Sequence, residues 1–133
     1  MIPDAAVDNS PMTITEFLEA RIAEDEMAAR NASPGPWTFS DIASVGGGTI
    51  YDPTVAIANV EWDTERVDSR IRRTRPDWQA DATGEHIARH DPARVLAECA
   101  AKRVLLGNAN YTALNALAAV YADHPDYKQE WAL

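Results

Sequence analysis

Several features that restrict what a protein can do are scarce or missing in this sequence of 133 residues. A single cysteine, Cys99, excludes an internal disulfide framework and suits a reducing cytoplasm. No apolar run approaches the roughly 18 residues that a membrane-spanning helix needs. The first ten residues contain Asp4 and Asp8 but no Lys or Arg, so we expect no signal peptide. These absences indicate a cytoplasmic protein that does not enter a membrane.

Basic residues are also few. Only 12 Lys and Arg stand against 21 Asp and Glu, which gives a net charge of −9 and a pI near 4.6. A net anion is repelled by the phosphates of nucleic acids and by anionic lipids. Non-specific binding to either surface is therefore disfavoured, and nucleic acid is not the partner that the composition favours.

What the chain does contain is the composition of an ordinary globular domain. Hydrophobic residues make up 46% and charged residues 25%, and the length fits one domain with one core. Residues 1–12 are small and acidic and include two prolines, so we expect a disordered lead. Residues 13–133 are expected to form a single α+β domain.

A capping box begins the ordered pattern. Thr13 and Glu16 have the spacing at which each side chain binds the other residue's backbone N–H group. Apolar residues then recur at helical intervals, at Ile14, Phe17, Leu18 and Ile22. The pattern predicts a helix over 15–30, which the prolines at 34 and 36 exclude from continuing.

The middle of the chain favours strands. Alternating or β-branched runs predict strands near 37–45, 49–52 and 54–62, and the glycines at 46–48 suit a hairpin turn between the first two. The simplest arrangement is a three-stranded antiparallel meander. Residues 63–83 show little apolar periodicity, so we expect a loop or a weak helix there.

Helical patterns return after Gly84. They predict a short helix over 85–90 and a second one that Asp91 caps and Pro92 opens. A third follows around 111–121, and Asp123 is expected to cap a last turn that ends at Trp131. The predicted fold class is α+β, with an N-terminal helix, the β-meander and a C-terminal segment of three to four helices.

The histidines suggest one chemical function. His86 and His90 are four residues apart on one predicted helix face, Asp91 follows, and His124 lies between two aspartates. Three such ligands and a water would make an open zinc or manganese site, typical of a metal-dependent hydrolase or a metal-binding protein. The alternative, which we prefer, is that the histidines are structural and Asp91 is a helix cap.

A cluster of arginines suggests a second possible chemical function. Five of the ten arginines lie close together in sequence, at Arg66, Arg70, Arg72, Arg73 and Arg75. Guanidinium groups bind phosphate oxygens in pairs, and Trp62 or Trp78 would stack a base, so a nucleotide or nucleic-acid site is an alternative function. The preferred interpretation is a solvated segment whose arginines pair with neighbouring carboxylates.

Two strings of residues carry a resemblance to a known family. They are GEHIARHDPARVLAE at 84–98 and YADHPDYKQEW at 121–131, after an opening helix that ends in the acidic run at 24–26. With them, the chain from Thr13 to Trp131 resembles a family of small actinobacterial and actinophage proteins of unknown function. The resemblance implies a cytoplasmic accessory protein and assigns no catalytic residue.

The function that the sequence favours is a non-enzymatic protein-interaction module. No nucleophile motif, cofactor loop or dense acid–base cluster is visible, whereas the C-terminal part is rich in aromatic residues. Aromatic residues are favoured as interface anchors. We therefore expect a protein partner and self-association into a homo-oligomer, through Tyr111, Tyr121, Tyr127 and Trp131.

Overall fold

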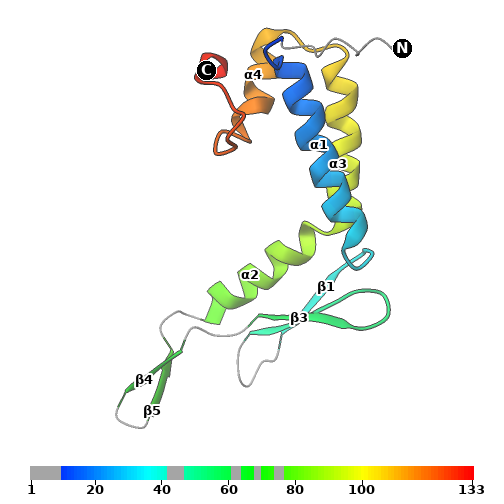
Figure 1. The fold of residues 1–133 in the computed structure, drawn as a ribbon. Helices are drawn as coiled ribbons and strands as arrows, with labels where there is room; N and C mark the ends of the chain where they lie inside the picture. The colour runs from blue at the N-terminus through cyan, green and yellow to red at the C-terminus, as the bar shows by residue number, and fades with distance from the viewer. Residues whose placement is uncertain (1–9, 42–46, 61–63, 68–69, 74–76) are drawn as a thin grey trace, which may run out of the picture. The chain divides into compact units, whose positions relative to one another are not determined.

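The computed structural model describes residues 10–41, 47–60, 64–67, 70–73 and 77–133, and at 64–67, 70–73 and 77 it describes the backbone alone (Figure 1). The elements in chain order are α1 (Ile14–Asn31), β1 (Thr38–Asp41), β2 (Gly48–Tyr51), β3 (Ala56–Val60), β4 (Thr64–Val67), β5 (Arg70–Arg73), α2 (Asp77–Arg89), α3 (Pro92–Leu106), α4 (Tyr111–Ala119) and the 3₁₀ helix η1 (Gln129–Trp131). The predicted α+β class is confirmed: an N-terminal helix precedes a three-stranded antiparallel sheet and three C-terminal α-helices.

The chain divides into two compact units. Unit 1 combines the N-terminal segment through Glu24 with Lys102–Leu133, and unit 2 is the continuous stretch Asp25–Ala101. Helices α1 and α3 each contribute residues to both units. Each unit has its own buried side chains, and the two are described separately below.

Helix α1 begins as the sequence predicts. The Thr13 hydroxyl accepts the Glu16 backbone N–H at 3.1 Å, and the Glu16 carboxylate accepts the Thr13 N–H at 3.3 Å, so both halves of the capping box form. The helix runs from Ile14 to Asn31, one residue beyond the predicted bounds at each end. These reciprocal bonds satisfy two N–H groups that the first turn leaves without helical partners.

Unit 1 is built around Phe17, which is fully buried. Its ring lies 5.1 Å from the ring of Trp131 and 6.3 Å from that of Tyr121, measured between centroids. The apolar side chains that complete this core are Ile14, Leu18 and Ala118, with Leu106, Leu114, Leu117 and Tyr127 partly buried around them. Residues of α1 are thus held by the last third of the sequence.

Unit 2 contains the sheet, in the order β1-β2-β3 with antiparallel neighbours (Figure 1). Phe39 of β1 is paired with the buried Ile50 of β2, and helix α2 contacts all three strands. A Cβ at Gly84 would meet the Phe39 ring at 2.3 Å. Glycine in the middle of α2 therefore lets the helix backbone lie directly against the Phe39 ring of the sheet, although glycine has a poor helix propensity.

The structure corrects the prediction for residues 63–83. Instead of a loop or a weak helix, β4 and β5 form a two-stranded antiparallel hairpin, in which Glu65 is paired with Arg72 and Val67 with Arg70. Helix α2 begins at Asp77, eight residues before the predicted start. The charged residues conceal the strands because a hairpin with few apolar residues gives no alternating pattern.

The last predicted turn is also corrected. Asp123 was expected to cap a turn reaching Trp131, but residues 120–126 form a series of tight turns, in which the His124 N–H donates to the Tyr121 carbonyl at 2.9 Å. Helix η1 starts separately after Lys128, which makes no side-chain cap bond. Tyr127 and Trp131 pack against the Phe17 ring. This packing, and not a cap at Asp123, accounts for the conformation of the segment before and in η1.

Candidate functional site

Trp37 of unit 2 lies in the segment between α1 and β1 and is fixed by two hydrogen bonds. Its backbone N–H donates to Oδ2 of Asp91 at 3.1 Å, and its indole Nε1–H donates to the Ser33 carbonyl at 2.9 Å. The chain before it runs close to Asp91, because a Cβ at Gly35 would lie 2.7 Å from the same Oδ2 atom. The half-buried indole is therefore held from its backbone and from its ring.

Asp91 is the residue that organises this region. It is only 9% exposed, and its second oxygen, Oδ1, accepts the Arg94 backbone N–H at 2.9 Å. This bond is the predicted helix cap, and Pro92 is the first residue of α3, as expected. One carboxylate thus starts α3 and anchors the backbone of Trp37, which is 54 positions away in the sequence.

Two hollows adjoin Trp37, and its side chain belongs to the wall of both. The first has a volume of about 210 Å³ and is mainly apolar; it is lined by Asp25, Ala28, Ala29, Ala32, Trp37, His90, Pro92 and Val95. The second, of about 350 Å³, is lined by Trp37, Thr38, Phe39, Glu85, Ala88 and Arg89. Helix α1, the Trp37 segment and the α2–α3 junction therefore meet around one indole.

The tautomer of His90 follows from its hydrogen bond. Its Nδ1 lies 2.8 Å from the carbonyl oxygen of His86, and a carbonyl oxygen only accepts, so Nδ1 carries the proton. In the neutral ring the other nitrogen, Nε2, is then an acceptor. The two imidazoles also lie against each other, with centroids 4.3 Å apart.

The residues of the predicted metal site belong to both units. In unit 2, His86 lies in α2, His90 follows the last residue of that helix with its ring against that of His86, and Asp91 uses both oxygens on backbone N–H groups. His124 belongs to unit 1, where its Nε2 contacts the Arg21 guanidinium. In the part of the chain that the structure describes, no group of three or more His, Cys, Asp or Glu side chains is placed to hold a metal ion. Asp91 forms the helix cap that the alternative interpretation predicts, and a metal-binding role for the histidines stays a prediction.

The predicted phosphate site stays a prediction. Arg66 lies in β4 and Arg70, Arg72 and Arg73 lie in β5, where the backbone alone is described. Arg75 and Trp62 lie outside the described residues. Trp78, the other candidate for stacking a base, is 69% exposed near the start of α2.

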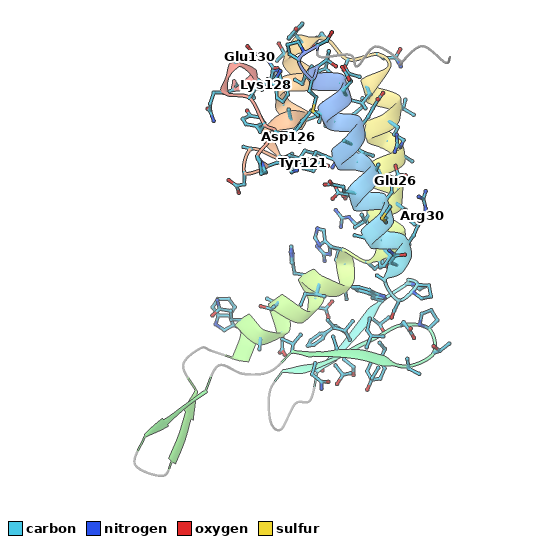
Figure 2. The ribbon with its side chains drawn as sticks, in the orientation of Figure 1. Glu26, Arg30, Tyr121, Asp126, Lys128 and Glu130 are labelled. Carbon is cyan, nitrogen blue, oxygen red and sulfur yellow. The ribbon has the colours of Figure 1, made fainter. Side chains whose placement is uncertain are left out.

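The aromatic residues predicted as interface anchors differ in burial. Trp131 is buried, and Tyr121 and Tyr127 are partly buried against the same core of unit 1, whereas Tyr111 is 74% exposed. Figure 2 labels Tyr121 and Lys128 in this unit. Lys128 is the residue directly before η1. Lys128 donates to the Met12 carbonyl at 2.8 Å. Core packing therefore accounts for three of the four, and their part in an interface stays a prediction.

Sequence reasoning did not single out Trp37 as a site residue. The two sequence segments that meet at the site are distinctive on their own, Pro34–Trp37 and His90–Pro92. No local periodicity joins them, because the bond between Trp37 and Asp91 is a tertiary contact.

Comparison with known proteins places the chain in a family. The model of a family of unknown function, DUF6221, matches residues 11–133. No curated protein and no solved structure matches the chain significantly. Among the described residues, no helix is both long enough and apolar enough to cross a membrane.

Proposed function

The chain thus belongs to the DUF6221 family, and from that premise we propose that it is a non-enzymatic protein-interaction module. In this proposal it is a small cytoplasmic accessory protein of an actinobacterium or an actinophage. It holds a short segment of a partner protein against Trp37 and also self-associates. The observation that carries the proposal is the anchored indole of Trp37 between two hollows.

Anchoring matters because binding has an entropic cost. A side chain that is already held loses little rotamer freedom when a partner covers it, and tryptophan is among the residues most enriched at interface hot spots. Trp37 meets both conditions, since its backbone and its indole nitrogen each make a hydrogen bond. The ring is nevertheless half-buried rather than sealed in a core.

The size of the hollows supports a protein ligand over a cofactor. Pockets for drug-sized ligands and cofactors usually have volumes of about 300–1,000 Å³. The volumes here, about 210 and 350 Å³, lie below or at the lower end of that range. Two small neighbouring hollows that share one aromatic wall suit two side chains of one peptide segment.

Site-specific photocrosslinking in an actinobacterial host tests this function. A benzoylphenylalanine at Arg89, on the wall of the second hollow, is expected to capture a discrete protein that mass spectrometry identifies. The matched control carries the same group at Val55, which is 58% exposed in the β2–β3 turn of the same unit. Adding Trp37→Ala to the Arg89 variant should abolish the product while the far-UV circular dichroism stays unchanged.

Two results would overturn the proposal. One is an Arg89 product no stronger than the Val55 product, and the other is a product that Trp37→Ala leaves unchanged. Trp37→Phe keeps an aromatic ring and the backbone N–H bond to Asp91, and it loses the indole bond to the Ser33 carbonyl. It therefore separates loss of the binding surface from loss of the fold.

Self-association is the second part of the proposal. Five large apolar side chains among the described residues of unit 1 are at least half exposed, namely Val104 (67%), Leu105 (50%), Tyr111 (74%), Val120 (68%) and Leu133 (79%). Burying such surface between copies is favourable. Native mass spectrometry at micromolar concentration is expected to show a homo-oligomer that Val104→Lys weakens, whereas a strict monomer would refute this part.

A further inference from the structure

We propose that the first hollow, between α1, Trp37 and the start of α3, receives a lysine or arginine side chain of the partner segment. This inference rests on the proposed function, and it names the chemistry of the ligand. It follows from the composition of the wall, from the two titratable residues on it and from the charges nearby.

The greater part of the wall suits an alkyl chain. It consists of methyl and methylene groups from Ala28, Ala29, Ala32, Pro92 and Val95. Lys and Arg have three or four methylene groups, which they bury along apolar surface while the charged head stays at the edge. A hollow of about 210 Å³ has room for one such side chain and not for a larger ligand.

The polar part of the wall suits a cation. Asp25 and His90 are the titratable residues of the wall, and in a neutral His90 ring Nε2 is an acceptor because Nδ1 donates to the His86 carbonyl. An ammonium group has three donors and a guanidinium group five, and neither has an acceptor. A cationic head therefore suits a wall whose acidic residue is an aspartate, whereas an anionic head would be repelled.

The indole adds a third attraction for a cation. A Lys or Arg head near the face of tryptophan gains about 0.5–1 kcal/mol at exposed sites. The hydrogen bond from Nε1 to the Ser33 carbonyl fixes the plane of the ring that the ligand would meet.

The surrounding charges agree with this preference. Two arginines on the helices that line the hollow form ion pairs, Arg30 with Glu26 at 3.3 Å and Arg94 with Glu98 at 2.9 Å. Figure 2 shows Glu26 and Arg30 side by side on α1. The chain as a whole has a net charge of −9, which attracts a basic segment.

The test is an NMR titration of the full chain with three capped tripeptides, Gly-Lys-Gly, Gly-Arg-Gly and Gly-norleucine-Gly. The reporter is the indole N–H signal of Trp37, identified by its absence in Trp37→Phe. Norleucine has nearly the same alkyl chain as lysine but no charge. We expect the Lys and Arg peptides to shift the Trp37 signal with Kd in the millimolar range and norleucine to bind about fivefold more weakly, the effect of about 1 kcal/mol.

Substitutions then identify the acceptor. Asp25→Asn should weaken the Lys peptide about fivefold and leave norleucine unchanged. Glu19→Gln removes the same charge from an exposed position of α1 that does not line the hollow, so it should have little effect. Equal losses in both variants would mean that net charge alone attracts the peptide, which would overturn the inference.

The two proposals fail in different ways. If norleucine binds as well as lysine while photocrosslinking captures a partner, the interaction module stands and the basic ligand is wrong. If the Lys peptide binds at Trp37 but no protein is captured in cells, the hollow recognises alkylammonium groups and the proposed protein-binding function is wrong. If no peptide shifts the Trp37 signal, the basic ligand is wrong.

Discussion

Replacing Asp91 by alanine should destabilise unit 2 by more than the loss of a helix cap. A cap bond contributes about 1 kcal/mol, with a range of about 0.5–2 kcal/mol. Asp91→Ala also leaves the Trp37 N–H without its acceptor, and a buried donor without a partner costs about 1–3 kcal/mol. We therefore expect the free energy of unfolding to fall by about 2–4 kcal/mol.

Asn110 provides a matched control. It caps α4 by accepting the Ala113 N–H at 2.9 Å, and it is exposed. Asn110→Ala should therefore cost only about 1 kcal/mol. The difference between the two variants measures the bond to Trp37.

Asp91→Asn refines the test. The Arg94 and Trp37 N–H groups bind different oxygens of Asp91, and asparagine replaces one of these oxygens by an NH₂ donor. In this geometry the amide therefore accepts from one of the two N–H groups. Urea denaturation followed by circular dichroism at 222 nm and by tryptophan fluorescence would measure all three variants. Equal losses of stability in Asp91→Ala and Asn110→Ala, or an Asp91→Asn variant as stable as the wild type, would contradict the double role of Asp91.

Three further outcomes are expected. Gly84→Ala should lower the denaturation midpoint although alanine favours helices, because its Cβ meets the Phe39 ring, and adding Phe39→Ala should make the Gly84→Ala change less costly in a double-mutant cycle. Trp131→Ala should cost about 3–5 kcal/mol in urea denaturation, and the exposed Tyr111→Ala less than about 0.5 kcal/mol; equal costs would contradict the core of unit 1. Hydrogen bonds from the Val55 and then the Thr54 backbone N–H hold the pKa of Asp52 below its usual 3.8, so its carboxylate stabilises the β2–β3 turn above pH 3.8 and this contribution is lost as the pH falls through the lowered pKa. A carbon-detected NMR titration of the Asp52 carboxyl group should give a midpoint below 3.8, and a midpoint at or above it would refute the assignment.

The parts of the fold that the sequence predicts well are those in which cause and effect are close in the chain. The capping box of Thr13 and Glu16 and the cap at Asp91 each act within three residues, and both form as expected. The start of α2 was misplaced because Gly84 resembles a helix boundary. Its real cause is the Phe39 ring, which lies on another element 45 positions earlier.

The candidate site was harder to predict for the same reason. The sequence indicates a cap or a metal ligand at Asp91 and a metal ligand at His90. The contact of Trp37 with the second oxygen of Asp91 does not follow from it, because hydrophobic periodicity reports which face of an element is buried and not what lies against that face. Distant side chains become neighbours only when the loop between them closes.

The composition of unit 1 from the two ends of the sequence has a consequence for the order of folding during synthesis. The rings of Phe17 and Trp131 are in contact, yet Trp131 lies 114 positions after Phe17 in the chain. Unit 2, by contrast, is a continuous stretch that is complete once Ala101 has been translated. On the ribosome, therefore, the sheet and α2 can form before the C-terminal residues that bury the apolar side chains of α1 have been translated. Those side chains stay exposed until the segment that contains Trp131 has also been translated, and during that interval a chaperone or a second nascent chain competes for them.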